Sequence, residues 1–327
     1  MVRACAIPGT VQNEKRDVMT ETIGMLGIGI MGSAIARNLV KAGFAVVGYD
    51  PVPAARDRLS EMGGKALLSP KDVAEAAAIS FASLPSAAAL AEAVEGPAGV
   101  VRASGSGQVL IECSTLPLSA KRAALVAMEG AGKTLLDCPV SGTGAQAATG
   151  DLVILGSGDE QAFARCGPAF AAMSRRQVHL GRFGTGSIMK YIANHLVTIH
   201  NAAAAEAMLL GMKAGIAPGL IYDTLADSAA TSRMFQMRGP LMRDENYDTP
   251  TATIRTHLKD LSIISSFAAE LGCALPVYAA AEQLYRAGEG LGFAACDTAS
   301  ICAVLERMNG FDRHGGASAS TTSSPQS

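Results

Sequence analysis

The sequence lacks an excess of positive charge, a long apolar run and paired cysteines, and each absence excludes a class of protein. The formal net charge is −2, which offers no basic surface for nucleic acid. No stretch approaches about 18 apolar residues without glycine, histidine or charge, so we expect no membrane span. Seven cysteines are scattered without a C-x-x-C pair or a His/Cys spacing typical of a metal site, so we expect no metal.

The two ends of the chain have little that could pack into a core. Charges at 14–17 interrupt the first 20 residues, which contain no apolar segment like that of a secretory signal. Together with cysteines that read as reduced thiols, this indicates a cytoplasmic protein. The end, from Asp312 onward, is rich in serine, threonine and glycine and predicts a flexible tail.

The most informative segment is a glycine-rich turn between an apolar strand and a helix. Gly27, Gly29 and Gly32 have the G-x-G-x-x-G spacing that places a pyrophosphate against backbone amides at a helix N-terminus. The turn therefore predicts a dinucleotide site. Its other members are Ile28, Ile30 and Met31.

Asp50 strengthens the prediction of a dinucleotide site. It ends the next apolar run, 44–49, and follows Gly32 by 18 residues. A carboxylate at that place can accept hydrogen bonds from the ribose hydroxyls and repels a 2′-phosphate, which favours NAD over NADP. Arg56 and Arg58 follow closely and could accommodate a phosphate, so NADP remains possible.

Apolar runs that read as strands alternate with helical segments through the first half of the chain. This alternation predicts an α/β fold with a Rossmann-type, doubly wound and mainly parallel sheet, and with ligands at the carboxyl ends of its strands. After the strand already described, the runs are 44–49, 79–84, 109–113, 134–138 and 152–156.

The pattern changes near Gly181. Residues 186–215 form an alanine-rich segment that is apolar on nearly all faces, which predicts a long interdomain helix buried on all sides. Such a helix usually needs a partner subunit, so we expect a homo-oligomer, a dimer or a tetramer. The remainder reads as helices only. The expected parts are an N-terminal extension (1–21), an NAD(P)-binding Rossmann domain (22–183), a helical substrate and oligomerisation domain (184–311) and a disordered tail (312–327).

Four motifs in this order resemble the β-hydroxyacid dehydrogenase family, which includes 6-phosphogluconate dehydrogenase-like enzymes. The resemblance covers about residues 22 to 308 and implies a nicotinamide-dependent oxidoreductase for a small carboxylate substrate, a β-hydroxyacid or a semialdehyde. The motifs are the glycine-rich turn, Asp137-Cys138-Pro139-Val140-Ser141-Gly142, Gly181-x-x-Gly184-x-Gly186-x-x-x-Lys190-x-x-x-Asn194, and Lys259-Asp260-Leu261.

Lys190 is the expected catalytic residue. Hydride transfer to a carbonyl leaves an alkoxide that needs a proton, and a lysine partly desolvated between domains can have its pKa lowered toward the working range. Asn194 lies one helical turn further and shares its face. The resemblance implies an acid/base role for Lys190 and an orienting role for Asn194. His195 lies well around the helix and reads as a packed or solvent-edge residue.

The resemblance implies further binding residues. Ser141, Gly142 and Thr143 follow a strand and offer a hydroxyl and backbone N–H groups to a carboxylate. Lys259 corresponds to a lysine at the mouth of the active site, beside both nicotinamide and substrate, while Asp260 most simply pairs locally. The remaining positions expected near the cofactor are Thr115, Leu84 and Pro85.

Three departures from the family pattern concern the substrate. Thr143 replaces a second glycine, and Ala252 stands where an aromatic residue is usual, seven positions before Lys259. The pocket-closing loop, 228–238, lacks the usual glycine and tryptophan. These changes indicate a roomier pocket.

Two alternatives remain open, an imine reductase-like reduction of C=N and a non-catalytic dinucleotide-binding scaffold. Lys190 disfavours both, because imine reductases of this fold typically carry Asp or Tyr there and the scaffolds have lost the lysine.

Overall fold

The computed structural model describes residues 21–314. The predicted N-terminal extension, 1–21, therefore lies outside the described residues except for Glu21. The predicted tail, 312–327, lies outside them except for its first three residues. No described helix is long and apolar enough to cross a membrane.

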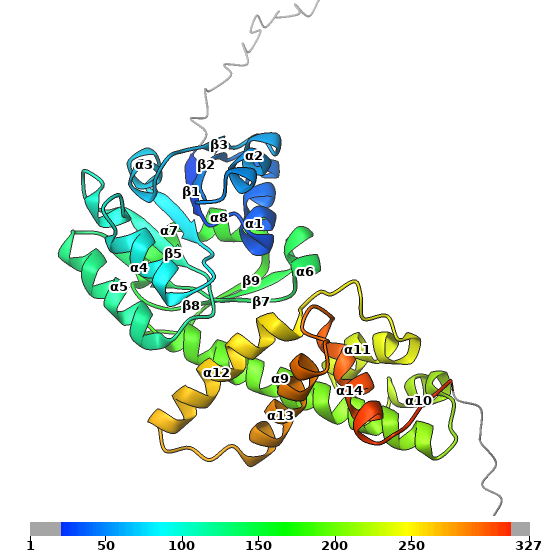
Figure 1. Ribbon diagram of the computed structural model, residues 1–327. Helices are drawn as coiled ribbons and strands as arrows, with labels where there is room; N and C mark the ends of the chain where they lie inside the picture. Colours follow the sequence, from blue (N-terminus) through cyan, green and yellow to red (C-terminus); the bar gives the residue numbers. More distant parts are fainter. Residues whose placement is uncertain (1–20, 315–327) are drawn as a thin grey trace, which may run out of the picture.

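Six parallel strands form the main sheet in the order β3-β2-β1-β4-β5-β6. Alternate side chains point to opposite faces, so Met25 and Phe81 join one hydrophobic cluster while Leu26 and Ala82 join another. Helices cover both faces, which confirms the predicted Rossmann-type doubly wound fold (Figure 1). The strands are β1 (Thr22–Leu26), β2 (Ala45–Tyr49), β3 (Lys65–Ala66), β4 (Ile79–Ala82), β5 (Val109–Glu112) and β6 (Thr134–Asp137).

Local sequence signals explain where the helices around this sheet begin. The hydroxyls of Ser69 and Ser86 accept hydrogen bonds from Asp72 N and Ala89 N, both at 3.1 Å, and cap two helices. Pro53 begins another helix, where its missing N–H costs nothing. The helices are α1 (Ile30–Lys41), α2 (Pro53–Glu61), α3 (Pro70–Ala76), α4 (Ala87–Glu95) and α5 (Leu118–Gly130).

A second, three-stranded sheet follows in the order β7-β8-β9. The sequence reading that added 152–156 to the main set of strands is wrong, because β8 pairs with β7 antiparallel and with β9 parallel. A short apolar run does not reveal which neighbour it pairs with. The elements here are β7 (Val140–Ser141), α6 (Gly144–Ala148), β8 (Leu152–Gly156), α7 (Glu160–Arg165), α8 (Gly167–Met173) and β9 (Ser174–His179).

The long helix α9 (Thr185–Lys213) runs from the sheet into the helical part of the molecule (Figure 1). There it contacts each of the α-helices from α10 to α14. Their shared core contains Tyr191, Met208 and Tyr285. These helices are α10 (Pro218–Leu225), α11 (Arg233–Asp244), α12 (Ile254–Glu270), α13 (Pro276–Gly290) and α14 (Ile301–Met308).

Helix α9 is not buried on all sides within one chain, contrary to the sequence-based expectation. Ile192 is 51% exposed, Leu196 47% and Met189 37%. These side chains recur at helical spacing and form one apolar stripe on α9.

Candidate active site

The glycine-rich turn has the shape that a dinucleotide requires. Gly27 has φ +83°, and a Cβ added there would lie 2.3 Å from the Ser83 carbonyl oxygen. A Cβ on Gly32 would lie 2.0 Å from the Gly27 carbonyl oxygen. At Gly29, by contrast, a Cβ would meet no atom within 4 Å. The outer glycines are therefore needed for packing, whereas the middle one leaves open space where a pyrophosphate can approach the backbone.

Asp50 joins the second strand to this turn. One carboxylate oxygen accepts a hydrogen bond from Ile28 N at 2.7 Å and the other from Val52 N at 2.9 Å. Arg56 donates to the Asp50 carbonyl oxygen at 2.6 Å, and Arg58 donates to the Ile28 carbonyl oxygen at 3.3 Å. Each carboxylate oxygen keeps a second lone pair for a ribose hydroxyl.

The turns after β4 and β5 lie beside the glycine-rich turn. Leu84 N donates to the Ser114 hydroxyl at 2.7 Å, and the Leu84 side chain would lie 3.1 Å from a Cβ on Gly27. Pro85 follows Leu84. Thr115 continues the turn after β5, and its carbonyl oxygen accepts a hydrogen bond from Lys259 Nζ at 2.9 Å. This bond connects the helical part to the carboxyl end of the sheet.

Lys190 and Asn194 lie on α9 one turn apart, facing the α12 residues Lys259 and Asp260. Asn194 Nδ2 donates to Asp260 Oδ2 at 2.8 Å. The Lys190 side chain is partly buried, and within the described residues its Nζ has no hydrogen-bond acceptor. The structure thus brings together four of the polar residues that the sequence motifs contain.

The surroundings of Lys190 make its ammonium group easier to deprotonate. Burial lowers the pKa of the Lys190 ammonium below its ordinary value; the Asp260 carboxylate opposes this shift and the Lys259 charge adds to it. A lysine with a lowered pKa exchanges protons more readily near neutral pH, as an acid/base group must.

Asp260 interacts with Asn194 as well as with Lys259, whereas the sequence suggested only local pairing. Its side chain is 15% exposed, and its Oδ1 atom lies 3.7 Å from Lys259 Nζ without a hydrogen bond. Burial raises the pKa of the Asp260 carboxyl above its ordinary value, against the opposing charges of Lys259 and Lys190. Local pairing with Lys259 occurs, but the bond to Asn194 crosses between helices, and no spacing in the sequence could reveal it.

The loop of Ser141, Gly142 and Thr143 lies at the β7–α6 turn. Thr143 and Gln146 form a capping box, so the Thr143 N–H already donates to Gln146 Oε1 at 3.0 Å. This N–H is therefore not free for a carboxylate, whereas the sequence suggested that successive N–H groups would be. A Cβ on Gly144 would lie 3.1 Å from Ile30, which places the loop beside the glycine-rich turn.

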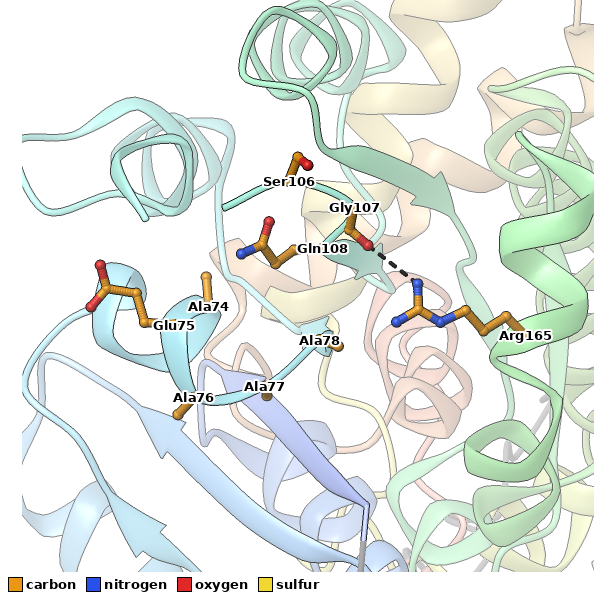
Figure 2. Close-up of a pocket in the computed structure, with 9 residues that line it drawn as sticks. All are labelled: Ala74, Glu75, Ala76, Ala77, Ala78, Ser106, Gly107, Gln108 and Arg165. Atoms are coloured by element: carbon orange, nitrogen blue, oxygen red, sulfur yellow. Dashed lines mark hydrogen bonds between the residues drawn. The ribbon is translucent and has the colours of Figure 1, made fainter. Parts of the chain in front are cut away.

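Two other features lie apart from the reacting groups. The His195 ring stacks on Tyr278 with centroids 5.1 Å apart, as expected of a packed histidine. A cavity of about 350 Å³ is lined by residues 74–78, 106–108 and Arg165, which Figure 2 shows as sticks. Residues 74–78 and 106–108 directly precede β4 and β5, so the cavity lies at the amino end of the sheet, opposite the glycine-rich turn.

Known proteins resemble the chain along most of its length. Residues 22–181 match the NAD binding domain of 6-phosphogluconate dehydrogenase, and residues 184–305 match the family described as NAD-binding of NADP-dependent 3-hydroxyisobutyrate dehydrogenase. An L-threonate dehydrogenase of Cupriavidus necator is 31% identical, over 88% of this chain and 97% of that protein. Glyoxylate/succinic semialdehyde reductase 2 of Arabidopsis thaliana is 28% identical, over 92% of this chain and 84% of that protein.

Solved structures agree with the sequence matches. The crystal structure of a 3-hydroxyisobutyrate dehydrogenase from Salmonella typhimurium has 29% identity and a TM-score of 0.77, covering 87% of this chain and 99% of its own. Such relatives support the hydroxyl/carbonyl reaction rather than imine reduction or a scaffold. The chain belongs to the β-hydroxyacid dehydrogenase family of NAD(P)-dependent oxidoreductases that act on CH–OH groups.

Proposed function

We propose that the chain interconverts a small β-hydroxyacid and the matching semialdehyde, with Lys190 as general acid/base. The observation that carries this proposal is the Lys190 amine, partly buried and without a hydrogen-bond acceptor in the described chain, one turn from Asn194. The bond from Lys259 to Thr115 supports this proposal, because it joins the helical part, to which Lys190 belongs, to the carboxyl end of the sheet.

The glycine-rich turn and Asp50 would hold the dinucleotide, which when bound would supply the hydride in reduction and accept it in oxidation. During reduction, Lys190 Nζ gives a proton to the substrate carbonyl oxygen. During oxidation, the neutral amine takes the proton from the hydroxyl group. Asn194 orients the same oxygen from one turn away, while Asp260 restrains the Asn194 amide. These roles need no metal ion.

The substrate carboxylate would bind the Ser141 hydroxyl and the Gly142 N–H, with the Lys259 ammonium nearby. Gly142 has φ +144°, which is strained for any other residue, and a Cβ there would lie 2.6 Å from the Leu152 side chain, which would have to shift. With Ala252 in place of an aromatic side chain, the pocket would admit acids longer than three or four carbons. The names of the relatives, threonate and semialdehyde enzymes, agree with a small carboxylate. A panel of hydroxyacids, semialdehydes and cyclic imines would identify the substrate.

We further propose that the enzyme prefers NAD to NADP. The Asp50 carboxylate, accepting bonds from Ile28 N and Val52 N, would repel a 2′-phosphate. The expected result is a higher kcat/KM with NAD than with NADP, and Asp50→Ser should reduce the difference. A preference of more than about tenfold for NADP in the unaltered enzyme would overturn this proposal.

Lys190→Ala tests the mechanism directly. Turnover should fall by about 10²–10⁴ because a positioned acid/base is lost, while cofactor affinity stays nearly unchanged. Lys190→Arg should not restore turnover, because a guanidinium stays protonated and cannot accept the proton. Steady-state rates and cofactor titrations measure both quantities. Near-normal turnover of a folded Lys190→Ala variant would contradict the proposal.

We also propose the division of the chain stated above, with a sheet domain over 22–183, a helical domain over 184–311 and a homo-oligomeric assembly. A cytoplasmic location accords with the cysteines of the described residues, all of which are free thiols.

A further inference from the structure

A buried ionic group lies beneath the carboxyl ends of β5 and β6. Lys121 of α5 contacts Glu112 Oε2 at 2.6 Å and Asp137 Oδ1 at 2.8 Å, and all three side chains are fully buried. Burial alone would lower the pKa of Lys121, but the charges of Glu112 and Asp137 outweigh it and raise the pKa above its ordinary value. The ammonium therefore stays charged. We call these three residues the Lys121 cluster.

The Lys121 cluster binds the first turn of α9. Asp137 Oδ2 accepts a hydrogen bond from Ser187 N at 2.8 Å, and Oδ1 accepts one from the Ser187 hydroxyl at 2.7 Å. The Ser157 hydroxyl donates to Asp137 and accepts from Gly184 N at 3.2 Å and Gly186 N at 3.0 Å. A helix N-terminus has unpaired N–H groups, and here buried groups of the sheet domain satisfy three of them.

The same cluster reaches the cofactor side of the site. Glu112 Oε1 accepts a hydrogen bond from Ser114 N at 2.9 Å, and the Ser114 hydroxyl accepts one from Leu84 N. One buried group therefore joins the turns after β4 and β5 to the helix that carries Lys190. Ser187 precedes Lys190 by three residues and lies on the same side of α9.

We propose that Asp137 and Ser187 are positioning residues for Lys190. By fixing the first turn of α9 against the sheet, they hold the Lys190 amine in its partly buried place beside the cofactor end of the site. This inference rests on the proposed acid/base role of Lys190. Neither residue touches the reacting atoms; they act through the backbone of α9.

Ser187→Ala is the variant that tests this inference. The first turn of α9 should loosen, and kcat for alcohol oxidation should fall about tenfold with little change in the KM for cofactor. Water would reach Lys190, so its pKa should rise and the pH at which oxidation accelerates should move upward. The titratable groups that interact electrostatically with Lys190 are Lys259, Asp260 and His257, all of which remain in the variant.

Two controls separate positioning from simple destabilisation. Ser187→Thr keeps the hydroxyl and should restore the original pH profile. Ser174→Ala removes another buried hydroxyl, bonded to the Phe170 carbonyl oxygen at 2.7 Å in a different part of the sheet domain, and should leave the profile unchanged. Should Ser187→Ala not fold, Ser157→Ala removes two other bonds to the same turn and takes its place.

A second measurement does not depend on turnover. Trace labelling with acetic anhydride across pH, followed by mass spectrometry, reports the pKa of Lys190, with the exposed Lys213 of the same helix as internal reference. Ser187→Ala should raise the pH at which Lys190 reacts. An unchanged labelling curve and pH profile would overturn the positioning role. Retained turnover in Lys190→Ala would instead overturn the proposed function.

Discussion

At the scale of single residues, the site depends on how charges surround one amine. Lys190 is partly desolvated, and its two charged neighbours act in opposite directions, Asp260 stabilising the ammonium and Lys259 destabilising it. Asp260 also accepts the Asn194 amide, so one carboxylate affects both the pKa and the geometry of the proposed acid/base pair.

Asp260→Asn isolates the charge effect, because an amide oxygen can still accept a bond from Asn194. Without the carboxylate, the pKa of Lys190 should fall further, so alcohol oxidation should begin to accelerate at lower pH than in the unaltered enzyme. Rate measurements between about pH 6 and pH 10 test this, since the range spans the neutral region and the ordinary lysine pKa. Glu270→Gln, at the exposed end of α12, is the matched control and should not move the profile. A shift to higher pH would contradict the assigned influence of Asp260.

At the scale of elements, α9 and α12 meet through a buried polar pair. His257 of α12 and the Thr198 hydroxyl of α9 lie 3.0 Å apart, and the histidine ring packs on Tyr285. Burial lowers the pKa of His257 from its ordinary 6.5 to about 4, with the charges of Lys190 and Arg238 adding to the effect. The environment between the packed helices therefore disfavours the protonated imidazole.

The free energy of unfolding should consequently decrease at acidic pH because His257 must become protonated. The unfolded chain protonates this side chain near pH 6.5 and the folded chain only near pH 4, so its contribution is complete above 6.5 and is lost as the pH falls toward 4. We expect a loss of about 3 kcal/mol across this window. Urea denaturation at pH 7.5 and pH 5 should detect about 2 kcal/mol of this loss, because pH 5 lies inside the window. His257→Gln should lose less stability between the same two pH values. Equal losses in both proteins would argue against this origin.

At the scale of the whole molecule, the apolar stripe on α9 remains exposed to solvent in a single chain. Met189, Ile192 and Leu196 lie on one side of a helix whose other sides contact the sheet domain and five helices. Exposed apolar surface of this kind commonly marks an interface between subunits. A second copy of the chain could cover it by a twofold axis, as in most homo-oligomers.

Charge on this stripe should therefore prevent the proposed association of two copies. Ile192→Glu combined with Leu196→Glu should convert an oligomer to a chain of 33.4 kDa in sedimentation equilibrium, since burying two carboxylates is unfavourable. Val126→Glu, which charges an exposed apolar residue on α5, should leave the assembly intact. A strict monomer before any substitution would show that the stripe has another role.

Whether a structural feature could be predicted from the sequence depends on how far apart in the chain the interacting residues lie. The glycine spacing, Asp50 and the alternation of strands and helices are local patterns, and the Rossmann-type fold that they predict is confirmed. The cofactor-binding roles of these residues stay predictions. Lys190 and Asn194 share one helix, so their spacing was informative too. The bond from Asn194 to Asp260, the Lys121 cluster and the antiparallel pairing of β8 join distant segments, and no local pattern contains them.

The bond between Asp137 and Ser187 also has a consequence for how the protein is made. The two residues are separated by 50 positions, and the ribosome releases the sixth strand well before the helix that completes the environment of its last carboxylate. Until then Asp137 lacks two of its hydrogen-bond donors. The nascent sheet domain therefore reaches its final stability only after translation has passed into the helical half, which links the folding of the two halves in time.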